Sequence, residues 1–280
     1  MKLIPSLSPR AWAAGGVTIK CETCDRTLPL RHLASRRTGI RLRGSWYCSA
    51  LCFTSAAEKE VSRILKSARD HAGHVPRMPL GLSLISRGLL TVEPLKRATD
   101  EQKEIGGEIG ELLVRNGSVT EKQVTAVRAA DWGCPVLNLA KHAEGIGISV
   151  PRTLAKRYSM IPVHYVAATG LLLVGFVHGV EYGLLYAIEQ MTGCQTKPCF
   201  VSPTDFQIQF ERTFEPKETS PRELNFENTG SVDEISRTLC FHGLQVEADE
   251  ARIEKCKDYL WARLKFASAA IDLLFRIPHT

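Results

Sequence analysis

The chain has 280 residues, of which 44% are hydrophobic and 24% are charged, and its formal net charge is +6. This composition is ordinary for a soluble globular protein, so at least one sizeable core is expected, and the length suits two or three modest domains. The positive surplus is too small to identify an acidic or nucleic-acid partner by itself. The N-terminus lacks a continuous apolar segment and contains Pro5, Pro9 and Arg10, so no secretory signal is expected.

Two close cysteine pairs mark the first segment of the chain. Cys21 and Cys24 form a C-x-x-C sequence, and Cys48 and Cys52 follow a strand-like Trp-Tyr sequence where a helix, Ala50–His71, is expected to begin. Zinc prefers four soft ligands in a tetrahedron, and a short loop presents two thiolates to one ion. We therefore predict a structural zinc ion held by these four cysteines. Four buried or free cysteines without a metal are the alternative.

The loop between the two cysteine pairs is basic. Beside a zinc ribbon, its arginines could contact nucleic acid or an acidic protein. A solvated basic face is the plainer interpretation, so nucleic-acid binding is kept only as a further alternative. The arginines concerned are Arg31, Arg36, Arg37, Arg41 and Arg43.

A repeated pattern follows. The stretch from Leu80 to Gln102 recurs in weaker form from Ile109 to Asp131, at an offset of 29 residues. Matches in type and order over such a length indicate one supersecondary unit used twice. The matched pairs include Leu80/Ile109, Gly81/Gly110, Leu84/Leu113, Gly88/Gly117, Thr91/Thr120 and Leu95/Val124.

Each copy predicts a helix, a tight turn and a second helix. Gly88 suits a left-handed cap after the first helix, and Thr91 suits the N-cap of the second. Gly81 and Gly110 lie where a helix is expected, although glycine costs about 1 kcal/mol there relative to alanine. Close approach of the backbone to a ligand or to another helix would explain them.

The next region alternates short helical and strand-like runs. Residues 158–180 carry no Asp, Glu, Lys or Arg and are numerous enough to cross a membrane. Pro162, Gly170 and Gly175 favour two short strands instead, so no membrane insertion is predicted. The expected elements are a strand Val136–Leu139, a helix Arg152–Tyr158, strands Ile161–Val166 and Leu171–Val177, a helix Glu181–Met191, a strand Thr196–Val201 and a helix Thr204–Arg212.

The chain therefore reads as an α+β protein. Residues 215–230 are rich in Glu, Pro, Ser and Asn and predict a linker. After it, a helix over Val232–His242 and two alternating runs, Tyr259–Phe266 and Ala270–Ile277, predict a helix plus a β-hairpin. The expected divisions are a zinc-binding segment with a trailing helix (1–73), a domain (76–214) in which the helical repeat (76–131) packs with a small α/β part (134–214), the linker (215–230) and a short C-terminal α+β piece (231–280).

The sequence shows no catalytic apparatus. It contains no G-x-x-x-x-G-K-S/T sequence, and no glycine is followed by lysine. Without a phosphate-binding loop, P-loop nucleotide hydrolysis is not expected. No Ser/His/Asp set, paired carboxylates or H-E-x-x-H sequence is evident, so an enzyme is not predicted.

The repeat carries a family resemblance. Its L-G-x-x-L-I-x-x-G-L-L-x-x-x-x-L-x-x-A-x-x-x-Q sequence resembles the paired motif in the N-terminal (MshEN-type) domain of type II secretion and type IV pilus assembly ATPases. The resemblance continues through Trp132–Leu139, Val150–Tyr158 and Ile161–Val163, and ends near Arg212. It implies a bacterial cytoplasmic protein whose partner is a component of secretion or pilus machinery.

The same resemblance implies a ligand, since some members bind cyclic di-GMP along the paired motifs. Pro79 and Glu108 replace the family's arginines here, and Asp131 replaces its second glutamine. Arg77 is the cation that could substitute. We therefore predict an adaptor or regulatory protein acting through protein contacts, with a cyclic di-GMP receptor as the alternative. The matching positions are Arg77, Leu80, Gly81, Leu84, Gly88, Leu95, Gln102, Ile109, Gly110, Leu113, Gly117 and Val124.

Overall fold

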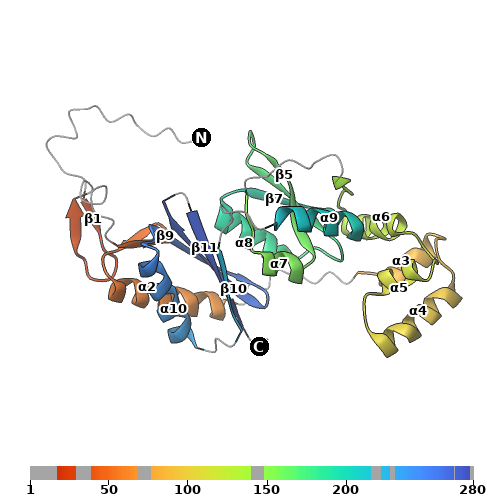
Figure 1. The fold of residues 1–280 in the computed structure, drawn as a ribbon, viewed down its shortest axis with the longest axis horizontal. Coiled ribbons are helices and arrows are strands. Elements are labelled where there is room, and N and C mark those ends of the chain that lie inside the picture. Colours follow the sequence, from red (N-terminus) through yellow and green to blue (C-terminus); the bar gives the residue numbers. More distant parts are fainter. Residues whose placement is uncertain are drawn as a thin grey trace. The chain divides into compact units, whose positions relative to one another are not determined.

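The computed structural model describes residues 18–29, 39–67, 77–139, 148–215, 222–227, 231–267 and 269–277. It divides into two compact units (Figure 1). Unit 1 combines both ends of the chain, Met1–Ala68 and Pro221–Thr280, and unit 2 is Arg69–Ser220. Each unit is described by itself.

Unit 1 is built on a six-stranded sheet with the order β4-β3-β9-β10-β11-β8. The long strands β9, β10 and β11 pair antiparallel, and β8 is parallel to β11. Arg41 and Leu42 pair with Glu250 and Ala251, so the two ends of the chain share one sheet. The strands are β3 (Ile40–Leu42), β4 (Ser45–Tyr47), β8 (Arg222–Phe226), β9 (Glu250–Cys256), β10 (Tyr259–Phe266) and β11 (Ala269–Arg276).

Two helices, α2 (Ala50–Lys66) and α10 (Val232–Gln245), pack with this sheet. Alternate residues of the long strands face them, because successive side chains of a strand point to opposite faces. Phe53, Leu239 and Leu260 are completely or almost completely buried in the resulting core. A separate hairpin, β1 (Thr18–Lys20) with β2 (Thr27–Pro29), completes the unit.

Three features of unit 1 differ from the sequence expectation. Residues 222–226, expected in a linker, form strand β8, in which Leu224 and Phe226 pack against the core. The C-terminal piece has three strands, since β9 precedes the predicted hairpin. It also shares its sheet with β3 and β4 of the cysteine segment. Both β3 and β8 are too short to show a period of their own, so only their pairing partners define them.

Unit 2 contains the helical repeat as predicted. Gly88 and Gly117 take left-handed φ values of +70° and +68°. In both copies the amide that follows the glycine donates to the carbonyl five residues back, Leu89 to Leu84 and Ser118 to Leu113, which is a Schellman-type cap. The helices are α3 (Leu80–Ser86), α4 (Val92–Ile105), α5 (Ile109–Arg115) and α6 (Glu121–Trp132).

The rest of unit 2 is a three-stranded sheet with three helices. Strands β5 (Met160–Val166) and β6 (Leu171–Phe176) are antiparallel, and β7 (Gln195–Phe200) is parallel to β6. The strand expected at residues 136–139 is reduced to a single bridge between Val136 and Phe200. The helices are α7 (Arg152–Arg157), α8 (Tyr182–Thr192) and α9 (Pro203–Thr213).

The α+β fold class is confirmed, with mixed helices and sheets in the described residues. The uncharged stretch 158–180 forms β5 and β6, as expected. Within the described parts of the chain, no helix combines the length and apolar character that crossing a membrane requires.

Candidate metal centre and nucleotide-binding positions

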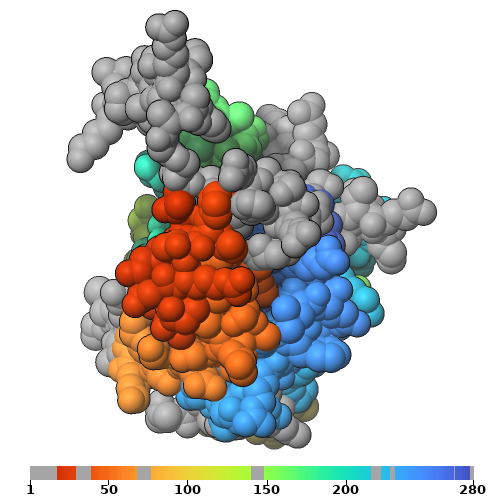
Figure 2. Space-filling view, turned by 90° about the vertical axis from the view of Figure 1, so that its left-hand side faces the viewer, coloured from red at the N-terminus to blue at the C-terminus, as the bar shows by residue number. Residues whose placement is uncertain are grey.

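The four predicted cysteines come together in unit 1. Cys21 follows β1, Cys24 lies in the turn before β2, Cys48 follows β4 and Cys52 lies in the first turn of α2. Their four Sγ atoms all lie within 4.8 Å of one another. The β1–β2 residues, red in Figure 2, form an outer face of the unit next to the orange residues that follow them.

Local hydrogen bonds position both pairs. The amide of Cys21 donates to the carbonyl of Arg26, which closes the hairpin turn around Cys24. The amide of Glu22 donates to the carbonyl of Trp46 at 3.4 Å, so β4 is tied to this turn. Ser49 is the N-cap of α2 and accepts from the amide of Cys52, as serine at this position commonly does.

The sulfur arrangement fits one tetrahedral metal ion. Zinc–sulfur bonds of about 2.3 Å in a tetrahedron place the sulfurs about 3.8 Å apart. The Sγ atoms of Cys24 and Cys48 are 3.4 Å apart, and those of Cys48 and Cys52 are 3.8 Å apart. All nine cysteines lie in the described residues and none forms a disulfide. The four donors would close the coordination sphere, as in a structural site.

The thiols of the cluster differ in how readily they ionise. Burial raises the pKa of Cys21, but backbone amides of Cys48, Thr23 and Cys24 outweigh it and lower that pKa to about 6. Burial, together with the neighbouring thiols, raises the pKa of Cys48 to about 12. Four adjacent sulfurs therefore do not all ionise by themselves, whereas a bound metal ion deprotonates a coordinating thiol.

The structure describes only part of the basic loop. Arg31, Arg36 and Arg37 lie outside the described residues. Arg43 forms ion pairs with Glu60 of α2 and, at 3.1 Å, with Glu254 of β9. Arg43 is thus occupied within unit 1, which weakens the interpretation of the loop as a nucleic-acid surface.

The repeat glycines are explained by contact between helices. A Cβ atom on Gly81 would overlap the side chain of Leu95 on α4. One on Gly110 would lie 3.0 Å from Leu80 and 3.1 Å from Val124. The structure therefore shows close approach of another helix at both glycines.

The apolar positions of the motif form the repeat core. Leu84 and Leu113 are completely buried. Leu80, Leu95 and Ile109 are partly buried and pack against that core. These side chains hold the four helices together, whatever else they contact.

The polar positions are engaged within unit 2. The side-chain Nε2 of Gln102 donates to the backbone carbonyl of Gly107 at 2.7 Å. Asp131 pairs with Arg87 at 2.8 Å. Thus both terminal positions of the paired motif, the retained glutamine and the substituted aspartate, have partners inside the protein.

Arg128 was missed by the sequence interpretation. It is buried, and its Nη1 atom donates to the carbonyl of Val177 and lies 2.9 Å from Nδ1 of His178. Its Nη2 atom lies 3.4 Å from the carboxylate of Glu108. The available signal was its place in α6, since Val124 and Arg128 share a helix face at i, i+4 spacing.

The surroundings of His178 disfavour its protonation. Burial lowers its pKa, and the positive charge of Arg128 lowers that pKa further, while Glu108 and Glu111 oppose the change. Glu108, whose side chain is 51% exposed, thereby belongs to a charge cluster with Arg128 and His178.

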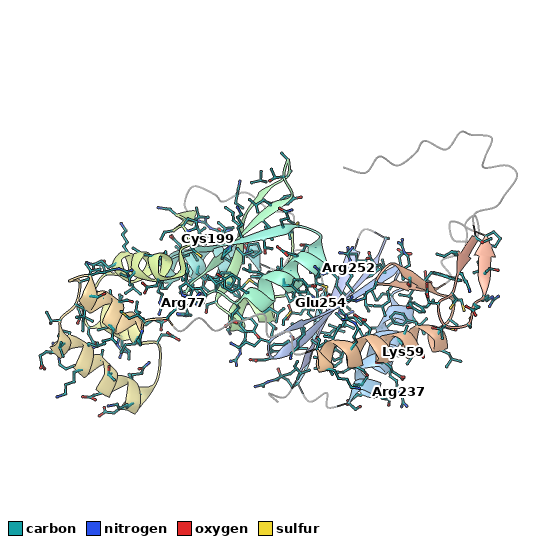
Figure 3. The ribbon with its side chains drawn as sticks, turned by 180° about the vertical axis from the view of Figure 1, so that it is seen from behind. Lys59, Arg77, Cys199, Arg237, Arg252 and Glu254 are labelled. Carbon is teal, nitrogen blue, oxygen red and sulfur yellow. The ribbon has the colours of Figure 1, made fainter. Side chains whose placement is uncertain are left out.

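Arg77 lies against the end of α6 (Figure 3). Its guanidinium is centred 3.3 Å from the indole ring of Trp132, a cation–π arrangement. Trp132 in turn lies near the rings of Tyr182 and Phe200. The stacking joins Arg77 to the α/β part of unit 2.

Comparison with known proteins supports the resemblance. No protein-family model matches the chain. It is 29% identical over 121 residues to the type IV pilus assembly ATPase PilB of Thermus thermophilus, covering 42% of this chain and 14% of that protein. It is 24% identical over 170 residues to PilB of Myxococcus xanthus, covering 56% of this chain and 30% of that protein. The chain thus spans less than a third of either relative.

Two solved structures were also matched. A structure of MshE with cdg is 20% identical, with 49% of this chain and 100% of that chain covered and a TM-score of 0.41. The N-terminal domain of XpsE is 19% identical, with 49% and 94% covered and a TM-score of 0.39. The chain is similar in sequence to a part of two type IV pilus assembly ATPases.

Proposed function

We propose that this chain is a non-catalytic adaptor or regulatory component of a type II secretion or type IV pilus-like system and acts through protein–protein contacts. The similarity to PilB supports the assignment to this machinery. The bacterial cytoplasm is the proposed location. Nine free cysteines are compatible with such a reducing compartment.

One observation carries the adaptor role. The positions at which the resemblance places a nucleotide are used for contacts inside unit 2: Gly81 against Leu95, Asp131 with Arg87, and Glu108 with Arg128. Charge-assisted hydrogen bonds are worth roughly 1.5–3 kcal/mol each. Replacing two arginines by Pro79 and Glu108 removes such bonds to a dianionic dinucleotide and adds a repulsive carboxylate.

The proposed docking surface is the α/β part of unit 2, residues 134–212. Val136 and Tyr182 are 49% and 43% exposed. Tyr182 lies beside Trp132, and Val136 pairs with Phe200, which also lies beside Trp132. Tyrosine, tryptophan and arginine are the residues most often found to dominate binding at protein interfaces.

Affinity purification of the full chain from its native cells tests this function. We expect a secretion or pilus component to co-purify with the wild type and to be lost with Tyr182→Glu. Leu244→Glu on α10 is the matched control, since Leu244 is similarly exposed, at 52%, and lies outside residues 134–212. Purified protein that hydrolysed ATP or GTP above a buffer control would refute the non-catalytic assignment.

We also propose that Cys21, Cys24, Cys48 and Cys52 hold one structural zinc ion. Four thiolates in a tetrahedron suit zinc. The ion would link the β1–β2 turn, the end of β4 and the start of α2. Around it, the small core of Cys21, Trp46 and Cys52 is poor in apolar side chains, so the metal would supply much of the local stability.

Metal analysis of protein purified without chelator tests the zinc site. We expect about one zinc ion per chain and a lower content in Cys48→Ser. Cys194→Ser is the control because Cys194 is half-buried and lies outside the cluster. Full zinc content in Cys48→Ser would refute the assignment.

A further inference from the structure

The four cysteines of the candidate metal centre are not equivalent. Cys21 and Cys52 are 0% and 8% exposed, whereas Cys24 is exposed and Cys48 is half-buried. Solvent therefore reaches one member of each pair.

The two accessible sulfurs are also close to each other. Their separation is 3.4 Å, against 3.8 Å between Cys48 and Cys52. A disulfide needs an S–S distance of about 2 Å, so Cys24 and Cys48 would have to move by little more than 1 Å. They belong to two different segments, the β1–β2 turn and the end of β4.

We propose that Cys24 and Cys48 are a peroxide-sensitive pair that forms a disulfide and releases the metal ion. The inference rests on the proposed zinc site. Reactivity towards oxidants follows thiolate character and solvent access. Metal coordination supplies the first property for all four sulfurs, and exposure supplies the second only for this pair.

The chemistry balances with one peroxide molecule. The Cys24 thiolate attacks one oxygen of hydrogen peroxide, the O–O bond breaks and hydroxide leaves, which gives a sulfenic acid on Cys24. The Cys48 thiolate then attacks that sulfur and displaces a second hydroxide, so an S–S bond forms. The two sulfurs lose two electrons in total, peroxide gains them, and solvent protonates both hydroxides to water.

Oxidation would leave two ligands and a covalent bridge. Cys21 and Cys52 alone do not complete a tetrahedral site, so the ion is lost. The new bond would join two of the three segments that the metal joined, the β1–β2 turn and the end of β4, where Glu22 already donates to Trp46. A disulfide restricts the unfolded chain, so unit 1 would stay folded in its oxidised, metal-free form.

The test uses the full chain, purified reduced and with its zinc. Stoichiometric hydrogen peroxide should release about one zinc ion per chain, measured with a colorimetric zinc chelator, and dithiothreitol plus zinc should reverse the release. Non-reducing peptide mass spectrometry should find Cys24 linked to Cys48. Cys194→Ser should behave as the wild type, because that half-buried thiol lies outside the cluster.

Thermal unfolding adds a second readout. The oxidised protein should melt at a higher temperature than reduced protein stripped by chelator. A dominant linkage of Cys21 with Cys24, of Cys48 with Cys52 or between two chains would overturn the proposal, as would zinc retention at full oxidation. Protein that contains no zinc as purified would refute the proposed metal, and the disulfide map would then still decide for or against the pair.

Discussion

Arg128 provides the sharpest stability prediction for unit 2. The guanidinium is buried and contacts the carbonyl of Val177, the ring of His178 and the carboxylate of Glu108. It therefore links the helical repeat to the end of β6. Arg128→Ala removes all three contacts and leaves a carbonyl and an imidazole nitrogen without this donor.

The expected magnitude follows from these contacts. Hydrogen bonds to charged groups contribute roughly 1.5–3 kcal/mol each, and two of the three contacts are 2.9 Å long. Releasing the buried charge to water offsets part of that loss. We expect a net destabilisation of about 2–4 kcal/mol, against less than about 1 kcal/mol for the partly exposed pair of Arg87 and Asp131.

Urea unfolding, monitored by hydrogen exchange in peptides from residues 148–215, measures the change in unfolding free energy within unit 2. Arg87→Ala is the matched control, since it also removes an arginine that contacts α6. An equal or larger loss of stability in Arg87→Ala would refute the reasoning from burial.

Three further results are expected. Burial and Arg128 lower the pKa of His178 below its ordinary value of 6.5, so the unfolded chain binds more protons at this residue. The stability of unit 2 should therefore fall as pH drops below about 6.5, and this pH dependence should flatten in His178→Phe. An unfolding free energy of the wild type that does not change with pH would contradict this prediction. Gly88→Ala should destabilise unit 2 by about 1–2 kcal/mol because φ of Gly88 is +70°. Gly183→Ala, in the first turn of α8 where a Cβ meets open space, should stabilise it by up to about 1 kcal/mol. If urea unfolding shows changes in stability of the same sign for both variants, the left-handed cap at Gly88 is not the cause. Asp272→Asn should lower the unfolding free energy of unit 1 by about 3–5 kcal/mol, since Asp272 is 2% exposed and accepts hydrogen bonds from Arg263 and Trp261. A loss below about 1 kcal/mol in chemical unfolding would show that the Arg263–Asp272 ion pair is dispensable.

The sequence predicted the features that depend on local spacing. Gly88 and Thr91 mark a turn between two helices because left-handed caps and N-caps are chosen within a few residues. The two cysteine pairs were recognisable for the same reason. That the two pairs meet depends on contacts between segments, among them the hydrogen bond from the amide of Glu22 to the carbonyl of Trp46.

Features that depend on distant partners were not predictable. The pairing of Arg41 with Glu250 crosses most of the chain, and a three-residue strand has no period to announce it. Arg128 reads as a surface cation until Val177 and His178 are placed against it. Whether Gly81 meets a ligand or a helix likewise depended on the position of Leu95.

Calorimetric titration of the full chain with cyclic di-GMP tests the central claim most directly. If the motif positions serve contacts within unit 2 and do not hold a nucleotide, no heat beyond dilution should appear at micromolar protein and ligand. A submicromolar Kd that disappears in Gly81→Trp, with the fold retained by circular dichroism, would contradict the claim and make the chain a second-messenger receptor.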